Sequence, residues 1–295
     1  MLALLCAVLW GGLAVAIRYT QDDLPPIGTA GLRFALASAV LVGWARWQHA
    51  PLAVQPGQGR AVIVLGLLLF AQIALFHWGL TRTNSAHGSV LIGANPLFVA
   101  TIAHFVLPGD RLSLSKLLGL SVATAGLVTV VAGEQARWTS AGASADPATL
   151  AGDAIVLASS LLLGIKTVYT KHVLARTEVV KLLVWSNLLA TAMFLAYSLV
   201  FEGPERYRFT PAAVGGLLYQ GLVVAGFCFT AWTYLLRHHR ASQLAVFGFG
   251  QPLFGILFGV WLRGDAFSVW LGVGALAVAA GVYLVTRSEG LELGT

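Results

Sequence analysis

Charged residues are scarce in this chain. They make up 10% of its 295 residues, whereas hydrophobic residues make up 58%. An ordinary soluble domain contains roughly 25% charged residues, and a soluble protein this poor in charge could not cover its surface. The composition therefore excludes a soluble protein and predicts an integral membrane protein.

Residue combinations typical of catalysis or metal binding are also missing. The sequence has no His-Glu-x-x-His motif, no paired carboxylates inside an apolar run and no Cys/His spacing that suits a metal. Its two cysteines, Cys6 and Cys228, lie in apolar runs, where a thiol behaves as a small hydrophobe. Despite a net charge of +6, no basic run could hold a nucleic acid backbone. We expect no enzyme, metal, cofactor or nucleic acid partner, and keep a membrane-embedded enzyme as the alternative from another class.

What the chain does have is long apolar runs. A helix of roughly 20 apolar residues crosses a bilayer core about 30 Å thick, and ten candidate spans can be placed. Because no basic segment precedes the first run and no small-residue cleavage site follows it, we interpret that run as a mature helix and not as a signal peptide. The expected spans are 2–20, 27–47, 61–81, 86–107, 112–132, 149–171, 179–201, 212–236, 241–262 and 267–286.

The second half of the sequence repeats the first. A shift of about 155 positions aligns Gly93 with Gly248, Gly119 with Gly274 and Gly126 with Gly281. Self-similarity at a fixed period indicates a repeated structural unit. We therefore predict an all-α integral membrane protein of two five-helix repeats, 1–140 and 146–295, within one structural domain.

The basic residues of alternate loops predict the orientation. One set of loops holds ten Lys and Arg residues and the other holds six, and the positive-inside rule places the richer set, with both termini, in the cytoplasm. Because each repeat contains five spans, an odd number, the two repeats must be inverted. Inverted repeats are typical of secondary transporters. The richer set comprises Arg46, Arg60, Arg111, Lys116, Lys171, Arg176, Lys181, Arg237, Arg240 and Arg287.

Both repeats carry a carboxamide and a proline in the middle of an apolar run, Asn95-Pro96 and Gln251-Pro252. Proline removes the amide hydrogen that would bond the carbonyl four residues back, and hydrocarbon offers no water in its place. The prolines therefore predict two matched hinges. The carboxamides either satisfy the broken helices or bind a ligand between them, and the sequence leaves both possibilities open.

Further polar and aromatic residues in the apolar runs are candidates for a substrate site. Those in the eighth run fall at spacings of seven, four and three residues, which predicts one stripe. Interfacial anchoring is the alternative for His77, and extension of the side chain to the membrane surface is the alternative for Lys166. The candidates besides Asn95 and Gln251 are Trp10, Gln72, Phe76, His77, Lys166, Tyr169, Gln220, Phe227, Tyr234, Gln243 and Phe247.

These patterns together resemble the EamA-type family of drug/metabolite transporters. The resemblance rests on Trp10-Gly11, Leu32-Arg33-Phe34, the run from Asn95 to Phe98 with Gly109-Asp110, and its echo from Gln251 to Phe254. It implies a basket of ten helices in a bacterial inner membrane, with a central cavity walled by helices one, three, four, six, eight and nine. The aromatic candidates are similar to those of the aromatic amino acid exporters of that family.

The expected function is that of a secondary transporter that exports a small metabolite, an amino acid with an aromatic or other apolar side chain, by alternating access. An exporter of another metabolite or drug, such as a nucleoside, is the alternative, and an ion channel lacks the expected charge rings. No Asp or Glu lies in the middle of an apolar run. We therefore expect facilitated exchange, or proton coupling through a histidine such as His77. The expected partners are the lipid bilayer and the solute, and the oligomeric state is left open.

Overall fold

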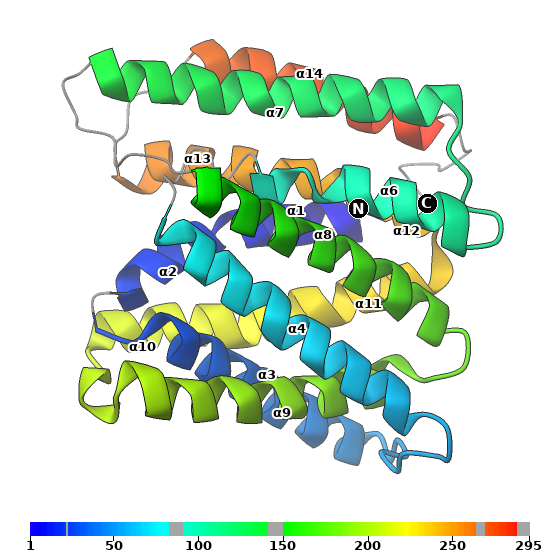
Figure 1. Cartoon of the computed structure of the whole chain (residues 1–295), viewed down its shortest axis with the longest axis vertical. Coiled ribbons are helices and arrows are strands. Elements are labelled where there is room, and N and C mark those ends of the chain that lie inside the picture. Colours follow the sequence, from blue (N-terminus) through cyan, green and yellow to red (C-terminus); the bar gives the residue numbers. More distant parts are fainter. Residues whose placement is uncertain (22, 83–90, 141–149, 264–268, 288–295) are drawn as a thin grey trace. The chain divides into compact units, whose positions relative to one another are not determined.

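The computed structural model describes residues 1–21, 23–82, 91–140, 150–263 and 269–287, and every regular element in these ranges is a helix (Figure 1). This confirms the predicted all-helical class. Shorter apolar helical stretches cover Leu2–Ile17, Leu91–Val106, Leu114–Thr129 and Gly272–Arg287. Five stretches are long and apolar enough to cross a membrane: Pro26–Trp47, Gly59–Leu80, Leu150–Val173, Val179–Glu202 and Pro211–His238.

The helices form two units, neither of which is one half of the sequence. Unit 1 comprises Met1–Gly11, Leu75–Val168 and His239–Thr295, and unit 2 comprises Gly12–Ala74 and Tyr169–His238. Each unit therefore takes helices from both predicted repeats, so elements that are distant in sequence supply one another's packing surfaces. The described elements of unit 1 are α1 (Leu2–Gly11), α6 (Asn95–Val106), α7 (Leu114–Ser140), most of α8 (Leu150–Val173), α12 (Ala241–Ala245), the 3-10 turn η4 (Val246–Phe249), α13 (Gly250–Arg263) and α14 (Val269–Arg287).

In unit 1, α7 packs along α14 through glycines that remove side-chain bulk. A methyl group placed on Gly119 would lie 2.7 Å from the carbonyl oxygen of Gly281, and one placed on Gly126 would lie 2.9 Å from that of Gly274. Small residues let apolar helices approach this closely. Because the contact moves down α14 as it moves up α7, the two helices are antiparallel.

Unit 2 is built around α3 and α9, which pack against each other, and around η3, a π-helix that packs on α3. Phe34 of α3 stacks on Phe194 of α9, with ring centroids 5.9 Å apart, and contacts Phe229, at 5.7 Å. Its described elements are α2 (Leu13–Gln21), α3 (Pro26–Trp47), most of α4 (Gly59–Leu80), α9 (Val179–Tyr197), η1 (Ser198–Glu202), η2 (Pro204–Arg206), α10 (Pro211–Leu218), η3 (Tyr219–Cys228) and α11 (Phe229–His238).

Several of the expected spans are interrupted. The first divides at Gly12 into α1 and α2, and the fourth has a turn at Ala94 before α6. The seventh ends in the π-helix η1, the eighth contains the π-helix η3, and the ninth divides into α12, η4 and α13. A methyl group placed on Gly12 would collide with the hydroxyl of Tyr219, which lies against this position. Apolar periodicity alone predicts where a span lies, but not these interruptions, because a break depends on which backbone groups find partners elsewhere.

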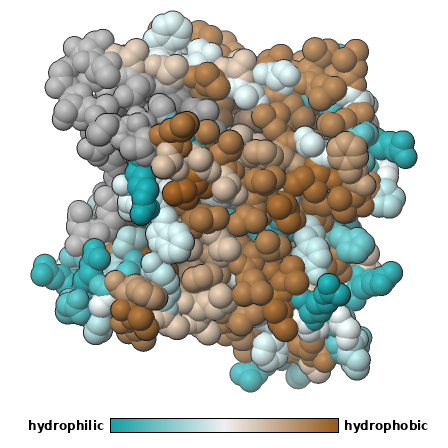
Figure 2. All heavy atoms as spheres, in the orientation of Figure 1, coloured by the Kyte–Doolittle hydropathy of each residue, from teal (hydrophilic) through white to brown (hydrophobic). Residues whose placement is uncertain are grey.

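Large apolar side chains are exposed on the surface of both units. Phe105 and Trp261 in unit 1 are 79% and 78% exposed, and Val200 in unit 2 is 72% exposed. In Figure 2 much of the visible surface is coloured as hydrophobic. Contiguous exposed apolar surface of this kind is unusual for a soluble monomer and fits a chain whose helices contact lipid.

Candidate functional site

The break in the fourth span is closed by side chains of α8, within unit 1. The proline at position 96 cannot donate to the carbonyl oxygen of Ile92, and that oxygen instead accepts a hydrogen bond from the Ser160 hydroxyl at 3.2 Å. The Asn95 side-chain amide donates in return to the carbonyl oxygen of Ser160 at 3.3 Å. Asn95 therefore ties the start of α6 to α8, which is the structural alternative that the sequence left open.

The break in the ninth span lies close to the break in the fourth span. A methyl group placed on Gly248, in the 3-10 turn η4, would lie 3.8 Å from Cγ of the buried Pro96. Within the described residues, no hydrogen bond engages the side chain of Gln251, which is half-buried. The predicted hinge Pro252 falls in α13, and its side chain lies outside the described residues.

The helices that flank the two breaks pack in equivalent ways. Gly164 of α8 lies against Phe98, two residues after Pro96, with a separation of 2.9 Å between a Cβ built on the glycine and that of Phe98. Gly11 of α1 lies in the same way against Phe254, two residues after Pro252, at 2.5 Å. Each break is therefore followed by a phenylalanine seated on a glycine of a neighbouring helix.

The other predicted residues of unit 1 have mixed exposure. Phe247 and Gln243 are 8% and 5% exposed, whereas Trp10, Phe76, His77 and Lys166 are half-buried. The rings of Phe76 and His77 lie perpendicular to each other with centroids 6.0 Å apart. Gln243 lies in α12 and Phe247 in η4, so both border the break in the ninth span.

In unit 2 the buried Gln220 connects the eighth span to the first. Its amide donates to the carbonyl oxygen of Ala16 at 3.3 Å and to the hydroxyl of Thr20 at 3.1 Å. Gln72 is also buried, at 7% exposure, and Tyr169 is half-buried. An amide with two such acceptors stabilises the contact between η3 and α2.

The expected stripe on the eighth span is not formed as predicted. Gln220 is 1% exposed, whereas Phe227 is 46% and Tyr234 54% exposed. Gln220 and Phe227 lie in the π-helix η3, while Tyr234 lies in the α-helix α11. Because hydrogen bonds of a π-helix join residues five apart, its turn is wider than an α turn and the assumed spacing no longer returns to one face.

Sequence reasoning missed Ser160 and Thr20, the hydroxyl partners of Asn95 and Gln220. Serine and threonine in an apolar helix usually bond within their own helix, and nothing in the sequence separates the few that bond elsewhere. One signal could have helped with Ser160. Ser160 lies four residues before Gly164, and Ile92 lies four residues before Pro96. Because Gly164 packs next to this proline, against Phe98, the equal spacing places Ser160 beside Ile92.

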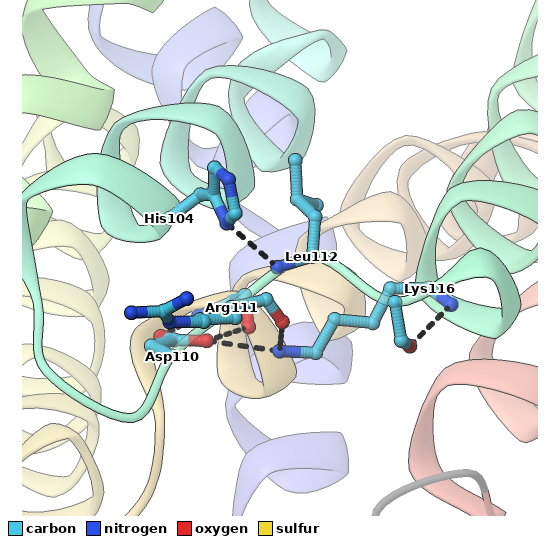
Figure 3. Close-up of polar contacts among 7 residues, drawn as sticks. His104, Asp110, Arg111, Leu112 and Lys116 are labelled. Carbon is cyan, nitrogen blue, oxygen red and sulfur yellow. Dashed lines mark hydrogen bonds and ion pairs between the residues drawn. The ribbon is translucent and has the colours of Figure 1, made fainter.

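A second polar site holds the start of the ninth span (Figure 3). The carboxylate of Asp110, in the Gly-Asp turn after α6, accepts hydrogen bonds from the backbone N–H of Ser242 at 3.0 Å and from its hydroxyl. It also forms an ion pair with Lys116, at 3.0 Å, and both charged side chains are almost fully buried. Asp110 thereby fixes the N-terminus of α12, where an anion is favoured by the helix dipole.

Burial and hydrogen bonding shift the pKa of Asp110 in opposite directions. Burial alone raises the pKa of its carboxyl, but the two hydrogen bonds from Ser242, together with the hydrogen bond and charge of Lys116, outweigh burial and lower the pKa below its ordinary value. The ammonium group of Lys116 also donates to the carbonyl oxygen of Arg111 at 2.9 Å. The carboxyl group of Asp110 is therefore ionised, and its hydrogen bonds are satisfied within the protein, which is typical of a structural site.

Neither polar site suits a metal. In the part of the chain that the structure describes, no group of three His, Cys, Asp or Glu side chains is placed to hold an ion. Chemically, the described sites offer hydrogen-bonding amides and hydroxyls beside interrupted helices.

Comparison with known proteins identifies relatives over most of the chain. The model of the EamA-like transporter family matches residues 1–132 and 150–287. An uncharacterized transporter of Bacillus subtilis, YoaV, is 27% identical over 257 residues, which cover 87% of this chain and 85% of the relative. A protein of Salmonella typhimurium named as a probable amino-acid metabolite efflux pump is 25% identical over 264 residues, covering 86% and 83%.

A solved crystal structure of a protein has a similar fold. It matches with a TM-score of 0.83 and covers 97% of this chain and 96% of that chain, at 20% sequence identity. At this identity the likeness concerns the fold alone.

Proposed function

Because the chain belongs to the EamA-like transporter family, we propose that it is a secondary transporter that exports an amino acid with an apolar side chain by alternating access. The single observation that carries this proposal is the proximity of the two helix breaks, Pro96 and Gly248, in unit 1. Interrupted helices at matching positions of two repeats are typical of transporter substrate sites, because the broken backbone offers polar groups at membrane depth.

The packing of α7 on α14 supports an inverted repeat. Gly119 and Gly126 of the first half align with Gly274 and Gly281 of the second, and the observed contacts cross over, Gly119 to Gly281 and Gly126 to Gly274. Two equivalent helices that meet antiparallel with exchanged partners are related by a local twofold axis across the helices. An axis of that kind, lying in the membrane plane, is what inverts one five-helix repeat relative to the other.

We extend this to ten spans with both termini in the cytoplasm of a bacterial inner membrane. The five long stretches and the shorter apolar helices support the count, and the excess of basic residues in one set of loops supports the orientation. In this arrangement the Asp110–Lys116 site lies at the cytoplasmic end of α7 and holds α12 there.

The proposed contacts with the solute follow from which polar groups are already engaged. The amides of Asn95 and Gln220 have partners within the chain, so we assign them to positioning. Gln251 is half-buried, and its side chain has no hydrogen bond within the described residues, so we assign it to the solute. We keep Trp10, Phe76, His77, Lys166, Gln243 and Phe247 as proposed contacts because they belong to the same unit as the two breaks. The hinges remain at Pro96 and Pro252.

An amino acid is preferred over a nucleoside or a drug because relatives of similar length are named as probable amino-acid metabolite efflux pumps, in Salmonella typhimurium and in Escherichia coli. Those names describe the relatives. The aromatic residues that border the breaks, Phe247 and Phe254, support a solute with an apolar group.

Counterflow into liposomes that contain the purified protein tests the proposal. Vesicles preloaded with one unlabelled amino acid should accumulate the labelled form, and protein-free vesicles give the background. Failure to move any solute in a panel of amino acids and nucleosides would refute the transporter proposal. Collapse of the proton gradient separates the two modes of coupling: unchanged exchange supports a facilitated carrier, and abolished uptake supports coupling through a histidine such as His77.

A further inference from the structure

Arg33, in the middle of α3, carries a buried positive charge that the proposed function does not use. It lies seven residues after Pro26, or about 10 Å along the helix at 1.5 Å per residue. The side chain is only 8% exposed, so it does not extend along the outside of α3 to a membrane surface. That observation removes the simplest explanation for an arginine inside an apolar helix, which is anchoring at the interface.

The guanidinium of Arg33 has no anion beside it within the described residues. Its Nε is buried without a hydrogen bond partner. Carboxylates of unit 2 that could have paired with it are engaged elsewhere: Glu202 accepts from the backbone N–H groups of Ile27 and Gly28, and Asp23 accepts from Thr210. A guanidinium offers five N–H donors and keeps its charge, and a donor buried without a partner, such as Nε, is costly. This indicates that another group supplies an acceptor for Arg33.

Other unsatisfied polar atoms lie on the same pair of helices. Within the described residues, Ser38 Oγ on α3 and Asn187 Nδ2 and Thr191 Oγ1 on α9 are buried without a hydrogen bond partner. Asn187 and Thr191 are four residues apart and so share one face of α9. Buried polar atoms without partners are few in native proteins and call for a ligand, water or mechanical explanation. Here they are concentrated where α3 and α9 pack together.

An aromatic ring lies against the guanidinium of Arg33. Its Cζ lies 5.0 Å from the ring centroid of Phe34, which itself contacts Phe194 and Phe229. The π-helix η3 passes close by, since a methyl group on Gly221 would lie 3.3 Å from the carbonyl oxygen of Arg33. An apolar wall strengthens the attraction between the guanidinium and an anion, and π-helical turns occur frequently at functional sites.

We propose that Arg33 forms a carboxylate-binding site within unit 2 and is the residue that selects anionic solutes. A guanidinium holds a carboxylate through two parallel hydrogen bonds, and the phenyl rings next to it suit a solute whose carboxylate is attached to an apolar group. The inference rests on the proposed function. It adds a specificity residue on α3. This helix is the second expected span, which the family resemblance does not place in the cavity wall.

The test compares solutes that differ only in the carboxylate. Counterflow and thermal unfolding are measured with L-phenylalanine and L-phenylalaninamide, and with L-leucine and L-leucinamide, for the wild type, Arg33→Gln, Arg33→Lys and the control Arg46→Gln. Arg46 is an exposed arginine in the last turn of the same helix. Arg33→Gln should raise the KM for the acids by about tenfold to a hundredfold, leave the amides unchanged and so remove the preference. Arg33→Lys should retain part of the preference, and Arg46→Gln all of it.

The outcomes separate this inference from the proposed function. Transport of acids and amides with equal KM by the wild type would overturn the role of Arg33 while the transporter stands, and this result does not depend on whether any variant folds. An acid preference that survives in folded Arg33→Gln would overturn it as well. If no solute is moved, the transporter proposal fails, and stabilisation of the wild type against heat by the acids but not by the amides would still support an anion site at Arg33.

Discussion

The two helix breaks occupy equivalent places in the repeat, but they are held in different ways. The carbonyl of Ile92 before Pro96 accepts a hydrogen bond from Ser160, and Asn95 returns one to the backbone of α8. Before Pro252 the chain instead forms the 3-10 turn η4. The residue of α1 that corresponds to Ser160, four before the packing glycine, is Ala7, which has no hydrogen-bonding side chain.

The ninth span is fixed at its start by Asp110. Asp110 binds both the backbone and the side chain of Ser242, at the start of α12. This anchor lies at the start of the span, whereas the break in the fourth span is tied directly to α8 through Ser160 and Asn95. On α1 the position equivalent to Ser160 is occupied by Ala7.

The difference suggests separate roles for the two breaks. We propose that the break in the fourth span serves as a fixed wall, since moving it would break the hydrogen bonds of Ile92 and Asn95. The side chain of Gln251 has no hydrogen bond within the described residues, so we propose that the break in the ninth span binds the solute and moves during alternating access.

The largest effect is expected from removal of the anchor at the start of the ninth span. Asp110→Asn leaves the buried Lys116 without a counter-charge, which should destabilise the protein by about 3–5 kcal/mol. Thermal unfolding in detergent measures the change. The exposed carboxylate variant Glu205→Gln should leave the midpoint unchanged, and adding Lys116→Met to Asp110→Asn should recover part of the loss. An unaltered midpoint for Asp110→Asn would mean that the ion pair does not hold α12.

The next effect tests the tie at the fourth break. Ser160→Ala leaves the Ile92 carbonyl unsatisfied in an apolar environment and should cost about 1–3 kcal/mol. The converse variant, Ala7→Ser, offers a hydroxyl to the break in the ninth span. It should leave stability equal or higher and should slow solute exchange. Both are followed by unfolding midpoint and by counterflow rate. If Ser160→Ala and Ala7→Ser have the same effect on stability, the two breaks are not held differently.

Much of this architecture could be predicted from the sequence because it depends on local composition. Apolar run length predicts the helices, and the alignment of Gly119 and Gly126 with Gly274 and Gly281 predicts equivalent glycine-lined faces in the two halves, although not that these faces contact each other. The prolines predict two breaks because the missing amide hydrogen is a property of the residue itself. None of these inferences requires knowledge of which helices are neighbours.

The parts that could not be predicted depend on contacts between distant segments. Asn95 and Gln251 look alike in sequence, and only the position of Ser160 on α8 distinguishes the engaged amide from the other. The π-helix η3 packs against α3, and its wider turn changes the face on which Phe227 lies. The buried charge of Arg33 could have been anchored at the interface, and its burial is a result of tertiary packing alone.

The two carboxamides should respond oppositely to truncation, with effects smaller than those above. Asn95→Ala removes the hydrogen bond from the Asn95 amide to the carbonyl oxygen of Ser160 and should lower stability by about 0.5–1.5 kcal/mol. Gln251→Ala should leave stability within about 0.5 kcal/mol but raise the KM for the exported solute roughly tenfold, because a hydrogen bond to the solute is lost. Unfolding midpoints and counterflow kinetics are measured on the same preparations. The reverse pattern would assign the ligand to Asn95 and the structural role to Gln251.

The smallest effect is expected from lowering the pH, which should destabilise the segment beside the break in the ninth span but not the break in the fourth span. The folded-state pKa of Asp110 lies below its unfolded value, so its stabilisation is complete above the unfolded pKa of about 3.9 and is lost as the pH falls through the lower folded value. No titratable side chain takes part in the bonds among Ile92, Asn95 and Ser160. Hydrogen exchange corrected for its intrinsic pH dependence should therefore show loss of protection in α12 below about pH 4, while the start of α6 stays protected. Equal loss of protection in both segments would indicate global acid unfolding and would remove Asp110 as the specific anchor of the ninth span.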